Sequence, residues 1–211
     1  MARFLVVLDV DSTLIEQEVI ELLADEAGSF EQVAAITARA MAGELDFGRS
    51  LVERVATLEG LDAAALERVS ARVELTRGAD ELVAGIHAAG GAVAVVSGGF
   101  HELLDPIAAQ LGLDAHRANR LEIADGRLTG RTTGAIIDAA AKRDALLEWA
   151  RQFDVPLTRT VAIGDGANDL AMMQTAALSI AFDAKPVVRE VAHVSLPERD
   201  LSRVLGVLGL T

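Results

Sequence analysis

The segment Phe4 to Leu14, FLVVLDVDSTL, constrains the fold of this chain more than any other. Its apolar run is typical of a strand buried on both faces, and Asp9 and Asp11 follow that run directly. In open α/β sheets ligands gather at the carboxyl ends of such strands, and alternate residues of an extended chain point to the same side. Two carboxylates that converge away from water are costly unless a cation joins them, and Mg²⁺, which prefers oxygen ligands, is the simplest candidate. Taken alone, the segment is equally compatible with a polar turn that caps the next helix.

Composition narrows the class of protein. The 32 acidic and 19 basic residues give a net charge of −13, which argues against a general nucleic-acid surface. No apolar run approaches the roughly 20 residues of a membrane-spanning helix, and the apolar start is too short for a secretory signal. We therefore expect a cytoplasmic protein that binds neither membranes nor nucleic acid and takes a small-molecule substrate; its oligomeric state is left open. With the first strand at Phe4, we also expect no feedback control by a separate regulatory domain.

A helical block interrupts the sheet after its first strand. From Ile15 to about Arg72 the sequence is rich in Ala, Leu and Glu and has no strand-like segment, and the strand pattern resumes only at Ala92. Helix starts are expected after the N-cap candidates Ser29, Asp46 and Asp62. We predict an inserted cap of four helices over residues 15–75, and an α/β core formed by residues 1–14 and 76–211.

The core alternates strands with helices, which predicts a central parallel sheet. Buried strands are expected over residues 92–96, 160–163 and about 178–181, and helices over residues 79–89, 102–111, 139–153 and 170–176. Residues 118–133 are polar and contain Asp125-Gly126, a dipeptide typical of a tight β-hairpin. Two weaker helical segments are expected to complete the chain.

Three of the predicted strands end in polar clusters, and this coincidence indicates an active site. The clusters are Asp9 with Asp11, Ser97-Gly98-Gly99, and Asp165 with Asn168 and Asp169. Because the carboxyl ends of parallel strands share one edge, we expect these clusters to meet, and Asp165 then adds a third carboxylate to the metal site. Ser97 and the Gly98 amide can hold phosphate oxygens, since glycine lets the backbone approach and the next helix start favours an anion.

Lys142 lies in the first turn of a predicted helix, where a cation is unfavourable for the helix dipole. In isolation it is best interpreted as a solvated surface lysine. If it points inward instead, it would neutralise phosphate charge.

The order DVDST, SGG, Lys142 and GDGAND resembles the four motifs of the haloacid dehalogenase superfamily of phosphotransferases. Further pieces over Phe4 to Pro186 resemble the branch that acts on phosphoserine: Glu18 in DSTLIEQEVIELLA, MAGELDFGRSLVERV, SGGFHELLDPIAAQLG and GDGANDLAMMQTAALSIAFDAKP. A small departure is Thr76-Arg77-Gly78, where the family more often has proline before the glycine. The resemblance implies a Rossmann-like core with helices on both faces of a central parallel sheet, plus a helical-bundle cap. It also implies a Mg²⁺-dependent phosphomonoesterase that hydrolyses O-phospho-L-serine to L-serine and phosphate, the last step of serine biosynthesis.

The resemblance also implies roles for the residues of the motifs. Asp9 is the nucleophile that forms an aspartyl-phosphate, and Asp11 is the general acid and base. Mg²⁺ is held by the Asp9 side chain, the Asp11 backbone carbonyl and Asp165, and Asp169 supports the metal ligands from outside. The residues implied to bind phosphate are Ser97, Gly98, Lys142 and Asn168.

The cap is implied to select the substrate. Arg54 would pair with the carboxylate of phosphoserine and Glu18 with its ammonium group. Met41 and Phe47 would form an apolar lid that excludes water, and Gly99 would line the substrate site. Without the resemblance, Arg54 and Glu18 would be interpreted as exposed helix charges, and Met41 and Phe47 as core residues.

Two alternatives are left open. A related phosphatase or phosphotransferase would act on another small phosphorylated metabolite, with the same core and a different cap preference. A receiver-like signalling module, whose aspartate accepts a phosphoryl group and switches a partner, explains Asp9, Mg²⁺ and Lys142. It gives no purpose to Asp11 as an acid and base or to the inserted cap, so it ranks below the enzymes.

Overall fold

The computed structural model describes residues 2–210, and in this part of the chain seven strands form one sheet. The strands are β1 (Leu5–Leu8), β2 (Ala92–Phe100), β3 (Ala115–Ala124), β4 (Arg127–Thr133), β5 (Thr160–Gly164), β6 (Leu178–Phe182) and β7 (Val194–Leu196). Their order is β4-β3-β2-β1-β5-β6-β7, and every neighbouring pair is parallel except β3 with β4. The predicted α/β fold is confirmed.

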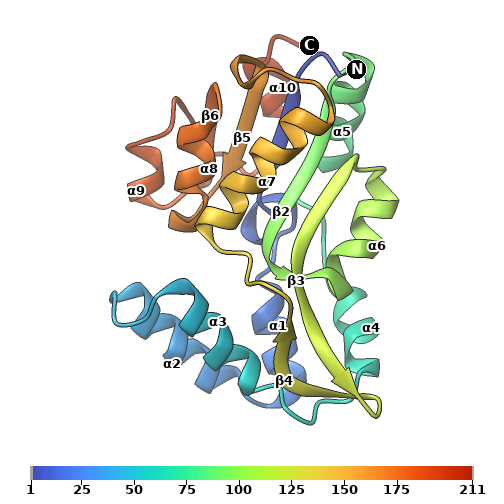
Figure 1. Ribbon diagram of the computed structural model, residues 1–211, viewed down its shortest axis with the longest axis vertical. Helices are drawn as coiled ribbons and strands as arrows, with labels where there is room; N and C mark the ends of the chain where they lie inside the picture. Colours follow the sequence, from blue (N-terminus) through green and yellow to red (C-terminus); the bar gives the residue numbers. More distant parts are fainter. Residues whose placement is uncertain (1, 211) are drawn as a thin grey trace.

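Helices cover both faces of the sheet (Figure 1). One face packs against α5 (Ala79–Ala88), α6 (His101–Leu111) and α10 (Arg203–Val207), and the other against α7 (Ala139–Gln152), α8 (Leu170–Thr175) and α9 (Pro186–Arg189). In β1, Val6 and Leu8 belong to the first core and Leu5 and Val7 to the second, all of them fully buried. Because successive side chains of a strand face opposite ways, this burial requires the continuous apolar run seen in the sequence.

Four helices stand between β1 and α5, at the carboxyl ends of the strands (Figure 1). They are α1 (Val19–Ala27), α2 (Phe30–Met41), α3 (Phe47–Ala56) and α4 (Ala64–Ser70). Ser29 and Asp46 are N-caps as predicted, whereas α4 begins one residue later than expected, after Ala63. The helices fall in the segment where the sequence predicts a cap, and the boundaries of that cap stay a prediction.

The inserted helices join the core through two adjacent chain segments. Ile15 and Leu75 form an antiparallel bridge, and the Thr76 N–H donates to the Leu14 carbonyl at 2.9 Å. The Nε of Arg77 lies 3.3 Å from a carboxylate oxygen of Asp200, and the Arg77 carbonyl accepts from the Leu201 N–H at 2.8 Å. Contacts with Asp200 and Leu201 therefore hold the junction between the inserted helices and the core in place.

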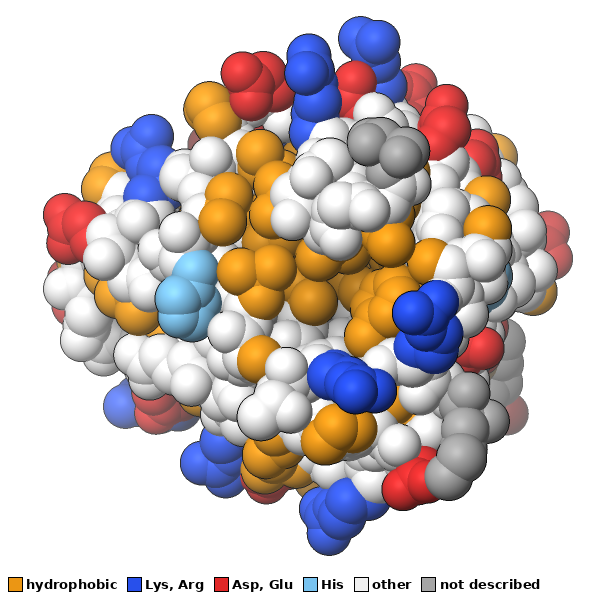
Figure 2. All heavy atoms as spheres, turned by 90° about the horizontal axis from the view of Figure 1, so that it is seen from above, with side chains coloured by type: hydrophobic (Ala, Val, Ile, Leu, Met, Phe, Trp, Pro, Cys, Tyr) orange, Lys and Arg blue, Asp and Glu red, His pale blue; other side chains and the backbone are white. Residues whose placement is uncertain are grey.

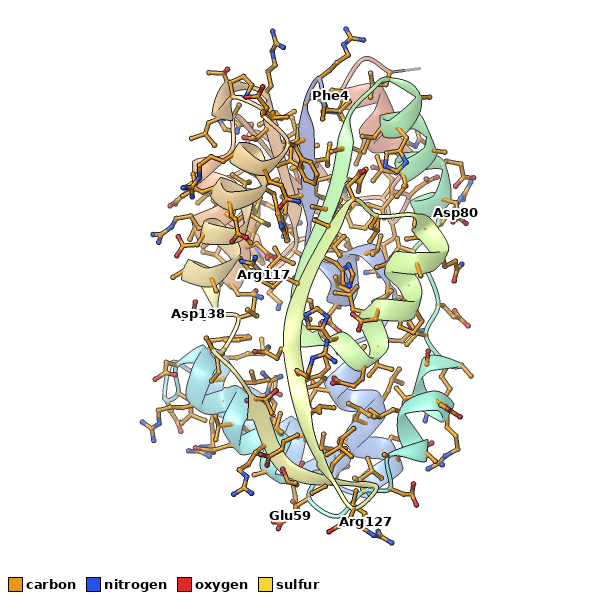
Figure 3. All side chains as sticks on the ribbon, turned by 45° about the vertical axis from the view of Figure 1, so that its right-hand side comes forward. Phe4, Glu59, Asp80, Arg117, Arg127 and Asp138 are labelled. Carbon is orange, nitrogen blue, oxygen red and sulfur yellow. The ribbon has the colours of Figure 1, made fainter. Side chains whose placement is uncertain are left out.

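A β-hairpin provides a third connection. Strands β3 and β4 meet at the predicted Asp125-Gly126 turn, and their tip reaches the inserted helices, where Figure 3 labels Glu59 and Arg127 close together. The Gly60 N–H donates to the Leu128 carbonyl at 2.8 Å, and the Leu128 N–H donates to the Leu61 carbonyl at 2.9 Å. The hairpin thus belongs to the core sheet at one end and contacts the inserted segment at the other.

Several elements differ from the expectation. Strand β2 continues to Phe100 rather than ending at Val96, because Ser97-Gly98-Gly99 remains extended. The first residues of β3 pair in parallel with β2, and the three-residue strand β7 was not predicted. Short strands with polar residues carry too little apolar periodicity to stand out in a sequence. No helix within residues 2–210 combines the length and apolarity that crossing a bilayer demands.

Helix α7 contributes Ala145, Leu146, Trp149 and Ala150 to the core on one face of the sheet, and the burial of these residues can be tested. Leu146 on α7 is fully buried, whereas Leu157, just before β5, is 43% exposed. We expect Leu146→Ala to lower the free energy of unfolding by about 2–5 kcal/mol, because a cavity remains in a packed core, and Leu157→Ala to cost less than about 1 kcal/mol. Urea denaturation of both variants measures this, and equal losses would contradict the packing described.

Candidate active site at the carboxyl edge of the sheet

The topology brings the three polar clusters together. Strand β1 lies between β2 and β5, with Leu8 in register with both Val95 and Ile163. The residues that follow these strands therefore emerge side by side. Carboxylate oxygens of Asp9, Asp165 and Asp169 all lie within 4.8 Å of one another.

Asp9 is 4% exposed and is held by two donors on one oxygen. Its Oδ1 accepts from the Val10 N–H at 2.7 Å and lies 2.6 Å from the Nζ of Lys142. Burial, and after it the charge of Asp169, raises the pKa of Asp9, while Lys142 acts in the opposite direction. One oxygen is therefore fixed by the protein, and the carboxylate is oriented for chemistry at the other.

Lys142 is completely buried, so the interpretation as a surface lysine is wrong. Its Nζ lies 2.8 Å from Asp169 as well as 2.6 Å from Asp9. Burial alone would lower the pKa of Lys142, but Asp169 and Asp9 outweigh it and raise the pKa, which keeps the ammonium charged. Asp169 also accepts from the Gly166 N–H at 3.1 Å, so both of its oxygens have protein donors.

Asp165 is the least enclosed of the three acids. The Thr13 hydroxyl donates to it at 3.3 Å, and the Nζ of Lys185 lies 4.0 Å away. Burial, reinforced by the charge of Asp169, raises the pKa of Asp165 to about 6. A carboxylate set that is short of positive charge, with oxygen donors only, fits a hard divalent cation. Since Asp169 is occupied by Lys142 and Gly166, the oxygens of Asp9 and Asp165 are the better placed ligands.

Asp11 sits in an irregular turn that spans Val10–Leu14, in which Ser12 adopts a left-handed φ of 57°. Its two oxygens accept from different partners: the Val19 N–H at 2.9 Å and the Ser97 hydroxyl at 2.9 Å. Burial, followed by the nearby charge of Glu18, raises the pKa of Asp11 to about 6. A carboxyl with that pKa can donate and accept a proton near neutral pH.

The Ser97-Gly98-Gly99 segment must be made of small residues. A Cβ on Gly98 would lie 2.6 Å from the Phe47 ring, and a Cβ on Gly99 would lie 2.8 Å from the Asp11 carboxylate. The Ser97 hydroxyl, already donating to Asp11, accepts from the Gly99 N–H at 2.7 Å. The backbone is therefore exposed to the acidic cluster at the point where a phosphate is expected.

The residues predicted in the inserted segment differ in their contacts and in their exposure. Phe47 of α3 reaches Gly98, and Glu18 accepts from the Ser12 hydroxyl at 2.7 Å. Arg54 donates to the Ser50 carbonyl at 3.3 Å; burial lowers its pKa, against which the charges of Glu18 and Asp11 act. Met41 is 75% exposed at the end of α2, so it does not enclose the site in this structure.

Of the remaining residues, Asn168 was predicted and four others were not. Asn168 lies on the loop after β5, half-buried, with its amide oxygen against Gly166. Asn119 donates to the Gly98 carbonyl at 2.8 Å and accepts from the Ile137 N–H, so it supports the Ser97-Gly98-Gly99 segment from behind. The other contacts that were missed come from Ser12, Thr13 and Lys185. Ser12 and Thr13 follow Asp11 directly, so their position was a usable signal, whereas nothing local marks Asn119.

Known proteins provide an independent comparison. The model of the haloacid dehalogenase-like hydrolase family matches residues 6–174. A protein of Streptomyces coelicolor named phosphoserine phosphatase is 55% identical over 210 residues, which cover 100% of this chain and 51% of that protein. One of Streptococcus thermophilus with the same name is 50% identical over 97% of this chain and 95% of its own length. The chain thus spans about half of one relative and nearly all of the other.

Solved structures give the same result at the level of the fold. One described as a phospho-aspartyl intermediate analogue of phosphoserine phosphatase has a TM-score of 0.93 and 42% identity, covering 98% of this chain and 99% of that one. A substrate-bound phosphoserine phosphatase has a TM-score of 0.93 and 41% identity, with the same coverage. Sequence motifs, buried acidic cluster and similarity agree, and the chain belongs to the haloacid dehalogenase-like hydrolase family.

Proposed function

We propose that this chain hydrolyses O-phospho-L-serine to L-serine and phosphate through an aspartyl-phosphate on Asp9, as the last step of serine synthesis in the cytoplasm. The observation that carries the reaction type is the buried Asp9, fixed through one oxygen by Lys142 and Val10 beside two further acids. The substrate rests on relatives named phosphoserine phosphatase at 50% and 55% identity, and on Glu18 and Arg54 in the inserted helices.

Asp9 attacks phosphorus with one oxygen of its carboxylate, and the other oxygen takes part in holding the proposed Mg²⁺. A carboxylate is a weak nucleophile, so the rate depends on its fixed position and on the neutralisation of negative charge near the phosphoryl group. The Lys142 ammonium supplies part of that neutralisation without leaving Asp9. Ser97, the Gly98 amide and Asn168 would hold phosphate oxygens as charge develops on them.

Asp11 protonates the leaving serine oxygen and later removes a proton from the water that hydrolyses the aspartyl-phosphate. Its pKa of about 6 keeps a protonated fraction available at neutral pH. Hydrogen bonds from Val19 and Ser97 hold the carboxyl group in place, while Asp9 stays dedicated to the attack. The two acids of the first motif therefore have separate roles.

We propose Mg²⁺ as the cofactor, held by the side chains of Asp9 and Asp165 and the backbone carbonyl of Asp11, with Asp169 supporting this set. The oxygen-only donors and the raised pKa values of Asp9 and Asp165 fit such an ion. When bound, Mg²⁺ neutralises phosphate charge and polarises the phosphoryl group. Lys185, 4.0 Å from Asp165, lends partial compensation from the protein.

The inserted helices select the substrate in this proposal. Glu18 accepts the ammonium group of phosphoserine and Arg54 pairs with its carboxylate. Phe47 excludes water above Gly98, where the structure already places its ring, and Met41 closes over the site only when α2 moves inward. Gly99 lines the substrate site because no side chain fits between it and Asp11.

The first prediction concerns the nucleophile. Asp9→Asn should lower phosphate release on the order of 10⁴-fold, because the amide cannot form the aspartyl-phosphate. The measurement is phosphate release from a panel of phosphorylated amino acids and sugars, with and without Mg²⁺. Wild-type turnover that favours a phosphorylated sugar would move the proposal to a related phosphatase, and a long-lived phospho-enzyme without turnover would favour a receiver-like module.

The second prediction separates specificity from chemistry. Arg54→Ala should lower kcat/KM for phosphoserine by about 10- to 100-fold, since an ionic hydrogen bond to the carboxylate is lost, and should leave an aryl phosphate nearly unaffected. Arg49→Ala, at an exposed position five residues earlier on α3, is the matched control and should change neither value. Equal losses on both substrates would remove the assignment of Arg54.

The third prediction concerns metal and pH. In the metal-free protein the pKa of Asp165 is about 6, above that of the unfolded chain, so its contribution to the free energy of unfolding falls as pH rises towards 6. Mg²⁺ binds the deprotonated acids, so the rise in Tm caused by Mg²⁺ should be larger at about pH 7 than at about pH 5. Asp165→Asn should nearly abolish this shift, whereas Asp125→Asn at the hairpin turn should preserve it. A shift that is independent of pH would contradict the assignment.

A further inference from the structure

A second cavity lies at the opposite end of the sheet from the acidic cluster. It measures about 540 Å³ and is bounded by the segments that precede β1, β5 and β6 and by the last residues of the chain. Both termini lie at this end in Figure 1, and Figure 2, which views it from above, shows hydrophobic side chains gathered in a hollow with Lys and Arg side chains around it. Cavities of this size are typical of small-molecule sites.

The interior of the cavity is apolar. Phe4, Val161, Leu178, Leu208 and Leu210 line it, and all five contribute to the hydrophobic core on one face of the sheet. Phe4 is fixed by close packing, because a Cβ on Gly91 would lie 2.6 Å from its ring. These five side chains form the floor of the cavity, and this floor is thus a rigid continuation of the core rather than a group of loose surface side chains.

Two guanidinium groups border this floor. Arg3 and Arg159 both line the cavity, and within residues 2–210 neither forms an ion pair with a carboxylate. The Arg3 stem packs on Gly90, and its guanidinium donates to the Ala89 carbonyl at 3.3 Å. Within the described residues 2–210, therefore, the rim of this apolar cavity carries two arginines without a carboxylate partner, and such a rim attracts an anion even though the chain has a net charge of −13.

We propose that this cavity binds a small amphipathic anion, with its carboxylate or sulfonate head between Arg3 and Arg159 and its apolar body on the Phe4 and Leu178 floor. The head group gains charge-assisted hydrogen bonds from guanidinium groups, and the body removes exposed apolar surface from water. The site is separate from the acidic cluster and does not depend on the proposed reaction. Strands β1 and β5 connect the two, since Phe4 and Val161 stand at the beginning of strands that end at Asp9 and Asp165.

The experiment titrates the 211-residue chain with 8-anilinonaphthalene-1-sulfonate, followed by fluorescence, and competes the dye with decanoate. Wild-type protein should bind one equivalent saturably, and decanoate should displace it. Arg3→Glu and Arg159→Glu should each weaken the affinity at least about tenfold, because each removes one ionic contact and adds repulsion. Ala177→Trp, which fills the cavity from its rim, should weaken it comparably.

Arg127→Glu is the matched control. Arg127 also donates to a backbone carbonyl, that of Gly60 at 2.7 Å, and lies at the hairpin turn, far from Phe4 in Figure 3. The Arg127→Glu variant should bind the dye with the same affinity as the wild type. Unchanged phosphate release and Tm in Arg3→Glu and Arg159→Glu would show that these variants fold.

Three results would overturn the proposal. They are the absence of saturable binding by the wild type, equal affinity in Arg159→Glu and Arg127→Glu, and displacement of the dye by decanol as effectively as by decanoate. Light scattering tests one further alternative. If the wild type is a dimer and Arg159→Glu dissociates it, the cavity is assigned to contact with a second copy of the chain instead.

Discussion

The buried ammonium of Lys142, held between Asp9 and Asp169, is the interaction on which the carboxyl edge of the sheet depends. Three acids gathered out of water would repel one another and take up protons, and removing this buried cation would leave them uncompensated. The lysine comes from the first turn of α7, whose other buried residues anchor it in the core beneath β2 and β1. Core packing and site electrostatics are therefore coupled through one helix.

The single ammonium group of Lys142 does not balance the negative charge of all three acids. One ammonium group faces three acids, and burial together with the charge of Asp169 raises the pKa of both Asp9 and Asp165. The three acids could hold a divalent cation, because its charge would offset the repulsion between their carboxylates. The pKa of Asp11 is raised to about 6 for a different reason, namely burial followed by the charge of Glu18, and this value suits the general acid proposed above.

Much of the fold and of the candidate site could be predicted because both depend on strand ends. The apolar run before Asp9 identifies a doubly covered strand, and similar runs precede Ser97 and Asp165, so parallel topology alone places the three clusters together. Other features depend on tertiary contacts that leave no local pattern. Asn119 is an ordinary polar residue in a half-exposed strand until β3 pairs with β2 and directs it at Gly98. The burial of Lys142 contradicts its helix position and follows only from the acids around it, and the exposure of Met41 depends on where α2 ends.

The hairpin connects the inserted helices to the core sheet at a point away from the two chain segments that link them to it. Its two strands extend from the core sheet as a continuous ribbon, and the backbone at the far end of this ribbon is hydrogen-bonded to residues 60, 61 and 63. Because residues 60, 61 and 63 are hydrogen-bonded to this ribbon, any movement of the inserted helices relative to the sheet would have to bend β3 and β4. The closing movement proposed for the inserted helices would then be tied to the curvature of these two strands.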